Sequence, residues 1–200
     1  MAACLVRDST RSTHLRGKTM TKAQLTASLH SVSCKHTDDI VGGDQFYVCG
    51  GAVANGAIGV ALTIPMRIAA GQTLSFPTDH AVFFRDTVDD SATLSIGLNA
   101  FDQDLPMDWR DRYNDAVFGI QTTIKPLTTP RLAEKIATAT AAIPSRILEP
   151  GESDDRLGQL AVDIPLATAE PGIKTWHVTD RSAVSSWDYQ VTWHLDITRL

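Results

Sequence analysis

The sequence lacks long hydrophobic runs, and this excludes several classes of protein. No window approaches the roughly 18 consecutive apolar residues that a membrane-spanning helix needs. Residues 1–19 contain no apolar segment like the core of a signal peptide, and no Asn-x-Ser/Thr glycosylation site occurs anywhere in the chain. We therefore expect a water-soluble, cytoplasmic protein with no transmembrane segment.

The sequence also lacks the common catalytic motifs. It has no Gly-x-Ser-x-Gly nucleophile turn and no His-Glu-x-x-His zinc motif. Gly50, Gly51, Gly56 and Gly59 fit neither a P-loop nor a dinucleotide fingerprint, and Asn55-Gly56 is typical of a hairpin turn. We expect a protein that is not an enzyme, and we assign no catalytic residue.

Cysteine is scarce, with only Cys4, Cys34 and Cys49 in the chain. Without a secretion signal, buried reduced thiols are the expected state, although a Cys34–Cys49 disulfide remains an alternative if the two strands are neighbours. Cys34 and His36 have metal-ligand spacing, but no second pair completes a closed zinc site. We do not predict zinc.

Positive charge is scarce in the body of the chain. The formal net charge is −5, and residues 1–19 hold four bases against one acid, which leaves 14 basic and 22 acidic residues beyond them. An acidic body of this kind argues against binding to nucleic acid and suits a cation or a basic partner. Met20-Thr21-Lys22 resembles a natural start, so we expect a disordered leader over 1–19 and one domain over 20–200; the alternative for 1–19, which are rich in Arg, Ser and Thr, is an organelle transit peptide.

What the sequence does contain is alternation of apolar and polar residues with a period of two. The clearest run is at the C-terminus, where Trp187, Tyr189, Val191, Trp193, Leu195 and Ile197 alternate with polar residues. Such a run is typical of a strand with one buried face. The sequence predicts eight strands and a mostly-β, eight-stranded antiparallel β-sandwich; the strands lie near residues 25–32, 45–53, 58–64, 80–86, 94–100, 157–164, 173–179 and 187–197. The first strand is expected to change its buried face near Val32, at a bulge.

Residues 103–150 interrupt this rhythm with helical spacing. Apolar residues recur every three or four positions in two groups, the first running from Pro106, placed near the first turn, to Ile120 and the second from Leu132 to Ile143. Thr129 as cap and Pro130 at the first helical position predict the start of the second helix, and Pro144 predicts its end. We expect a two-helix insertion between two strands of the sandwich.

Aspartates concentrate in the predicted connections. If successive strands cross the sandwich in opposite directions, the first and fifth connections share one end. They hold seven candidate metal ligands: Asp38, Asp39, Asp44, Asp102, Asp104, Asp154 and Asp155. Asp86, Asp89 and Asp90 fall at the opposite end. Calcium takes six to eight oxygen ligands, mostly carboxylate and carbonyl, which such loops supply. Magnesium is a second candidate, and the alternative is that these aspartates serve only as turn and cap residues.

Some of these segments resemble a known family. The Asp-x-Asp of Asp102 and Asp104 at a strand end, and Asp155-Arg156-Leu157-Gly158 at the start of a late strand, resemble segments of C2 domains, the calcium- and phospholipid-binding β-sandwiches. Gly43-Asp44-Gln45-Phe46-Tyr47 is similar to a Gly-Asp-Glu-x-Tyr segment of small uncharacterised bacterial β-sandwich proteins, with Gln45 in place of the acid. The resemblance covers about residues 24–197, and the insertion at 103–150 departs from it. It implies a C2-like fold and calcium as ligand.

The function expected from the sequence is a non-enzymatic, calcium-binding C2-like module that binds a protein partner or an anionic surface through its cation. The aspartate-bearing loops hold few apolar or basic residues that would anchor a membrane, which favours a protein partner over lipid. The alternative is a cation-independent structural or interaction protein that uses the sandwich face or the insertion. Oligomeric state is left open.

Overall fold

The computed structural model describes residues 21–37, 43–103, 109–148, 154–181 and 186–200. Within them the eight predicted strands are all present, together with two three-residue strands that the sequence analysis missed. The strands are β1 (Lys22–His36), β2 (Asp44–Ala54), β3 (Ala57–Leu62), β4 (Met66–Ile68), β5 (Thr73–Ser75), β6 (Val82–Asp89), β7 (Thr93–Asp102), β8 (Asp155–Pro165), β9 (Gly172–Arg181) and β10 (Ser186–Arg199). The leader predicted over 1–19 lies outside the described residues.

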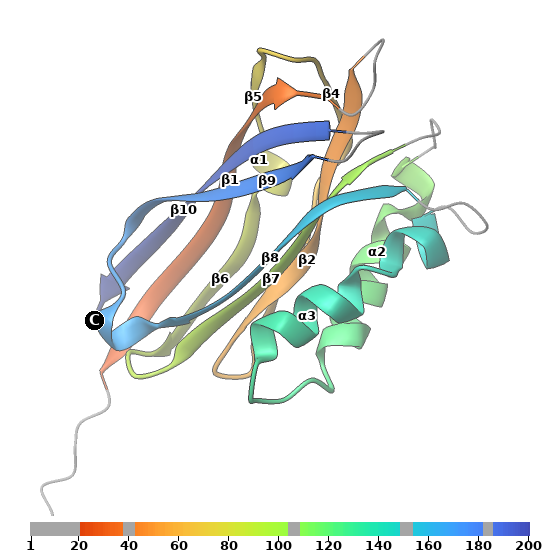
Figure 1. Ribbon diagram of the computed structural model, residues 1–200. Coiled ribbons are helices and arrows are strands. Elements are labelled where there is room, and N and C mark those ends of the chain that lie inside the picture. Colours follow the sequence, from red (N-terminus) through yellow and green to blue (C-terminus); the bar gives the residue numbers. More distant parts are fainter. Residues whose placement is uncertain (1–20, 38–42, 104–108, 149–153, 182–185) are drawn as a thin grey trace, which may run out of the picture.

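The strands form two antiparallel sheets that pack face to face (Figure 1). One sheet has the order β5-β1-β10-β9, with β6 also paired to β1, and the other has the order β3-β2-β7-β8, with β4 also paired to β2. The predicted mostly-β antiparallel sandwich is confirmed. Consecutive strands often change sheet, as a sandwich built from crossing connections requires.

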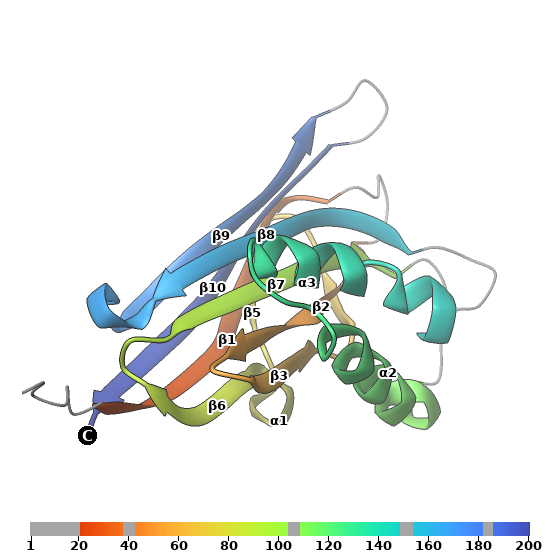
Figure 2. The same ribbon diagram turned by 90° about the horizontal axis from the view of Figure 1, so that it is seen from below.

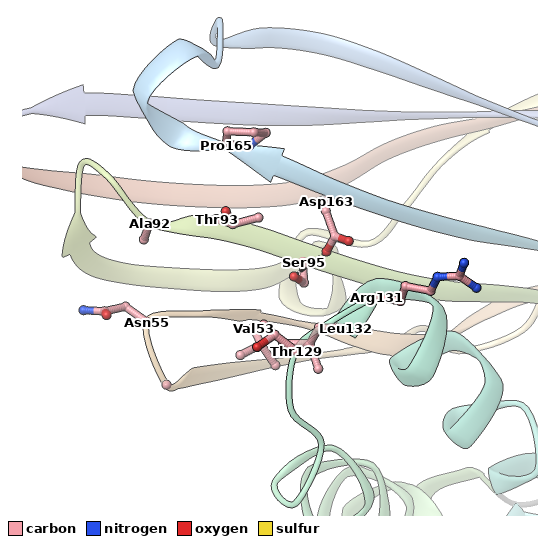
Figure 3. Close-up of a pocket in the computed structure, with 11 residues that line it drawn as sticks. Val53, Asn55, Ala92, Thr93, Ser95, Thr129, Arg131, Leu132, Asp163 and Pro165 are labelled. Carbon is pink, nitrogen blue, oxygen red and sulfur yellow. Dashed lines mark hydrogen bonds between the residues drawn. The ribbon is translucent and has the colours of Figure 1, made fainter.

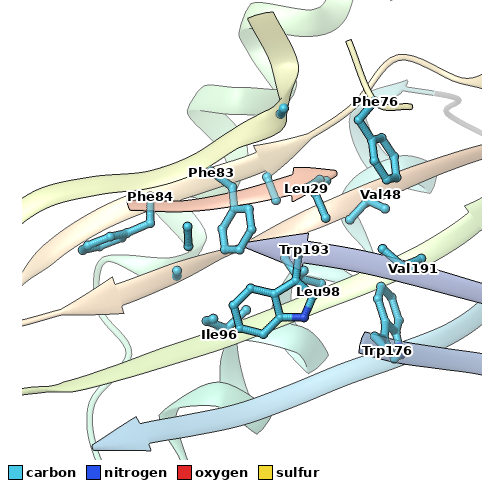
Figure 4. Close-up of a cluster of buried hydrophobic side chains, with 14 of the residues drawn as sticks. Leu29, Val48, Phe76, Phe83, Phe84, Ile96, Leu98, Trp176, Val191 and Trp193 are labelled. Carbon is cyan, nitrogen blue, oxygen red and sulfur yellow. The ribbon is translucent and has the colours of Figure 1, made fainter. Parts of the chain in front are cut away.

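The buried faces follow the predicted alternation. On β10, Tyr189, Val191 and Leu195 are fully buried and Trp193 is 3% exposed, so this face supplies the centre of the sandwich core. Figure 4 shows Trp193 packed among side chains of both sheets. On β1 the register shifts between Leu29 and Ser31, and this bulge keeps both Leu29 and Val32 buried, in agreement with the predicted change of face.

Helices form a third layer. Helices α2 (Trp109–Ile124) and α3 (Leu132–Thr140) cover the outer face of the β2, β7 and β8 sheet (Figures 1 and 2). A second apolar cluster, which includes Tyr47, Phe101 and Ile120, fills the space beneath them. The short helices α1 (Thr78–Ala81) and η2 (Leu166–Thr168) are in connections, and the π-helical turn η1 (Pro144–Leu148) follows α3. No helix among the described residues has the length and apolar content to cross a membrane.

The predicted boundaries of the second helix were wrong. Thr129 does not cap it and Pro130 is not its first residue, because Arg131 has the left-handed conformation at φ 57° and the helix begins only at Leu132. Pro144 does not stop the helical backbone either, since the π-helical turn starts there. A proline at the first residue of a helical turn costs no hydrogen bond, which explains why the chain can continue.

Close contact between α3 and β7 depends on Gly97. A Cβ atom at this position would lie 2.4 Å from the backbone nitrogen of Ala137 and 2.6 Å from the carbonyl oxygen of Ala133. Two residues along β7, Asn99 donates its amide N–H to the carbonyl of Ala137 at 2.9 Å and to Oγ1 of Thr140 at 3.2 Å. The absence of a side chain at Gly97 lets α3 approach β7 closely, and the buried hydrogen bonds of Asn99 hold it there.

Candidate functional site

The strand register gathers four of the predicted aspartates at one end of the sandwich. Phe46 on β2 pairs with Asp102 on β7, and Asp102 pairs with Asp155 on β8. Asp44 is the first residue of β2, and Asp154 immediately precedes β8. We call these four residues (Asp44, Asp102, Asp154 and Asp155) the aspartate end. Asp38, Asp39 and Asp104 of the predicted set lie outside the described residues.

Asp44 points between the two sheets. It has the same parity along β2 as Phe46 and Val48 of the sandwich core, and it is 1% exposed. The hydroxyl of Tyr189, which comes from the opposite sheet, donates a hydrogen bond to Asp44 Oδ2. Burial of a carboxylate requires hydrogen-bond donors, and Tyr189 supplies one of them.

Asp102 ends β7 on the same inward face. It is 7% exposed, and its Oδ1 accepts the backbone N–H of Gln45 at 2.6 Å. Its strand partner Asp155 is exposed. Directly paired residues of antiparallel strands present their side chains to the same face, with Cβ atoms about 5 Å apart. Asp102 and Asp155 are therefore the two described carboxylates best placed to bind one ion together.

Asp154 belongs to the other side of the sheet. The Tyr47 hydroxyl donates to Asp154 Oδ2, and Tyr47 belongs to the apolar cluster beneath the helices. There the Tyr47 ring stacks on Phe101 with centroids 5.2 Å apart and meets Trp109 edge-on at 5.0 Å. The sheet thus separates Asp154 from Asp44 and Asp102. In the described part of the chain, no three His, Cys, Asp or Glu side chains are grouped closely enough to hold a metal ion.

Sequence reasoning missed the two tyrosines whose hydroxyls donate hydrogen bonds to these carboxylates. Tyr189 was expected only on the buried face of its strand, and Tyr47 only as a residue of the strand near 45–53. The alternation along β2 contained a usable signal, because Asp44 shares its face with Phe46 and so had to be buried. A buried carboxylate implies a hydrogen-bond donor nearby, but nothing in the sequence shows which residue of the opposite sheet provides it.

Two of the three acidic residues predicted at the opposite end, Asp89 and Asp90, have basic or amide partners. Lys22 Nζ lies 2.6 Å from Asp89 Oδ1, and Asn55 donates to Asp89 Oδ2 at 3.0 Å. Arg199 Nε lies 3.4 Å from Asp90 Oδ1. These contacts balance the charges of Asp89 and Asp90 without a cation, so the aspartate end is the better candidate for one.

The described cysteines are free and buried. Cys34 lies in the sandwich core and Cys49 in the cluster beneath the helices, so a sheet separates them. Burial raises the pKa of the Cys34 thiol from its ordinary value of 9.0 to about 11, and burial also raises the pKa of Cys49. Buried neutral thiols of this kind are poor nucleophiles and poor metal ligands.

A cavity of about 610 Å³ opens near the other end of the sandwich, between the β2–β3 turn, β7, β8 and the start of α3 (Figure 3). Ser95 donates to Asp163 Oδ1 at 2.5 Å on its wall, and Arg131 lies 3.7 Å from Glu134. The polar groups named here are already paired within the protein. The cavity therefore offers no obvious set of groups that converge on a ligand.

No protein-family model and no curated protein matches this chain. Solved structures do match. Human GIVD cytosolic phospholipase A2 aligns with 91% of this chain at 15% identity and a TM-score of 0.40, and its complex with methyl gamma-linolenyl fluorophosphonate aligns with 89% at 11% identity and 0.38. The C2A domain of plant extended synaptotagmin 1 aligns with 89% of this chain at 9% identity and 0.36.

The shares of the matched chains differ. The alignments cover 17% of each of the two phospholipase chains and 95% of the plant C2A chain. A C2 domain is thus among the matches, as the resemblance from the sequence implied. At identities of 9–15% and TM-scores of 0.36–0.40 the likeness gives no residue-level detail of a site.

Proposed function

We propose that this chain is a non-enzymatic binding module whose aspartate end takes up a divalent cation, calcium in the first place, and through it binds a protein partner. The supporting observation is the pairing of Asp102 with Asp155 beside Asp44, on three adjacent strands. Two carboxylates on one face of a sheet can supply the first oxygen ligands of a calcium ion. Backbone carbonyls and water can supply the others.

The seven predicted ligands take different roles in this proposal. Asp102 and Asp155 bind the ion directly, with Asp38, Asp39 and Asp104 as further candidate ligands. Asp44 and Asp154, each bonded to a tyrosine hydroxyl, hold the strand ends in place and support the site from behind.

A protein partner suits the described surface better than a membrane does. The described residues next to the aspartate end include the bases Arg67, the β4 partner of Gln45, and Arg156, and four exposed large apolar side chains lie elsewhere, at Val82, Phe118, Ile173 and Leu200. Peripheral membrane sites ordinarily combine a basic face with an apolar tip. A cation at the aspartate end would instead offer its open coordination positions to an acidic group of a protein partner.

A thermal melt of the full chain tests this proposal. The protein is melted in EDTA and then in millimolar calcium or magnesium, because an ion that binds only the folded state raises the melting temperature by mass action. A rise with calcium supports the cation-dependent module. A melt that neither ion changes leaves the cation-independent interaction protein, in which the tyrosine hydroxyls and Gln45 N–H suffice to hold the carboxylates.

A further inference from the structure

A narrow slot opens between the sheets along the edges of β8 and β9. These two strands run side by side in Figure 2, yet the described residues of β8 pair only with β7 and those of β9 only with β10. The slot has a volume of about 350 Å³. Leu160, Val162 and Ile164 of β8 face it and remain half-buried, although they pack against the sandwich core.

Both ends of the slot are closed. At one end Gly158 approaches Val178 so closely that an added Cβ would lie 2.7 Å from Val178 Cγ1, and Trp187 Nε1 donates to the Leu157 carbonyl at 2.7 Å. At the other end the chain crosses from β8 to β9 through η2. A long strand cannot run through such an opening, so the slot suits a small ligand.

The deep wall of the slot carries an unsatisfied donor. Trp193 lines the slot and is 3% exposed, and its Nε1 has no hydrogen-bond partner among the described residues. In Figure 4 this nitrogen lies on the side of the indole that faces Trp176 of β9. A buried N–H without an acceptor costs free energy, and it would gain from an acceptor that enters the slot.

The residue paired with Trp193 on the neighbouring strand, Lys174, carries a positive charge. Lys174 on β9 is the direct strand partner of Trp193, so the two side chains share the inward face, and Lys174 also lines the slot. Lys174 is half-buried and makes no ion pair with any described residue. Glu170 is exposed at the rim, where water and salt screen its charge.

We infer that the slot binds a small aliphatic carboxylate. Its carboxylate accepts hydrogen bonds from the Lys174 ammonium and the Trp193 indole N–H, and its alkyl body lies against Leu160, Val162 and Ile164. An ammonium and a neutral N–H on neighbouring residues of one cavity wall can both donate to an anionic acceptor with two oxygens, and the apolar wall selects a ligand with a hydrocarbon part. This site lies along the sandwich edge and requires no cation at the aspartate end.

Octanoate is the probe, with 1-octanol as the neutral control. Octanoate is titrated into ¹⁵N-labelled full chain in EDTA, and the indole N–H signal of Trp193, assigned with Trp193→Phe, is followed. We expect this signal to move downfield and saturate at millimolar octanoate. We expect 1-octanol to bind at least about tenfold more weakly, because its neutral hydroxyl cannot form an ion pair with the Lys174 ammonium.

Two variants separate this site from nonspecific binding. Lys174→Met keeps the aliphatic stem and removes the charge, so octanoate affinity should fall about tenfold or more. Val162→Phe fills the slot and should abolish the shift. Lys125→Met, at the exposed position that follows the end of α2, is the matched control and should bind like the unaltered chain. An unchanged Trp193 signal, or equal octanoate affinity in Lys174→Met and Lys125→Met, overturns the inference.

Discussion

The hydroxyl of Tyr189 on β10 donates a hydrogen bond to Oδ2 of Asp44 on β2, and this bond joins the two sheets at the aspartate end. Burial is the main cause that raises the pKa of Tyr189 above its usual value of 10.0, and the hydrogen bond to Asp44 adds to it. Tyr189 therefore stays a neutral donor throughout the physiological range. Tyr47 and Asp154 repeat the arrangement on the helix side of the same sheet.

Tyr189→Phe should destabilise the fold by about 1–3 kcal/mol, because it leaves a nearly buried carboxylate with one donor fewer and also removes the hydrogen bond between the hydroxyl and Cys34. The free energy of unfolding from urea denaturation gives the measurement. Tyr47→Phe is the matched variant at Asp154 and should fall in the same range. Unaltered stability in both variants would show that these hydrogen bonds do not hold the strand ends.

Gly97→Ala should destabilise the protein by at least about 1–3 kcal/mol. The added methyl group would clash with backbone atoms of α3, which cannot move without displacing the helix. Gly158→Ala is the matched variant, since its Cβ would meet the Val178 side chain, which can move. We therefore expect a smaller cost at 158 than at 97 in thermal and urea unfolding. The reverse order would contradict the close packing of α3 on β7.

The raised pKa of the Cys34 thiol should lower the free energy of unfolding at alkaline pH. Its pKa rises from 9.0 to about 11 in the fold, first because burial disfavours the thiolate. Above pH 9 the unfolded chain therefore binds fewer protons than the folded one, so the free energy of unfolding falls as pH rises toward about 11. In a Cys4→Ser background, Cys34→Ala should flatten this fall, measured by urea denaturation at several pH values. An equal fall in both proteins would assign it to other groups.

The sequence predicted the sandwich well because its strands alternate cleanly. Along β10 every second side chain from Tyr189 to Leu195 is buried, and this pattern depends only on local geometry. The grouping of Asp44, Asp102 and Asp155 also followed from strand count and direction. The start of α3 was missed because Thr129-Pro130 has the composition of a helix start, while the left-handed Arg131 after it depends on tertiary packing.

The details of the candidate site were harder to predict. A loop position says which end of the sandwich an aspartate occupies, but the side of the sheet depends on register at each strand end. The shift between Ala100 and Phe101 in the β7–β8 ladder sets where Asp155 pairs, and no local pattern marks it. Trp193 and Lys174 belong to strands that were predicted correctly, yet the slot they line exists only because β8 and β9 do not pair.

Calcium uptake measured by calorimetry on the full chain is the most direct test of the central claim. We predict binding of calcium to the unaltered chain, and loss of that binding in Asp102→Asn with Asp155→Asn. Asp196→Asn, which removes an exposed carboxylate on β10, should bind calcium like the unaltered chain. No heat of binding at millimolar calcium, or equal binding in the double variant and in Asp196→Asn, would contradict the proposed cation site at the aspartate end.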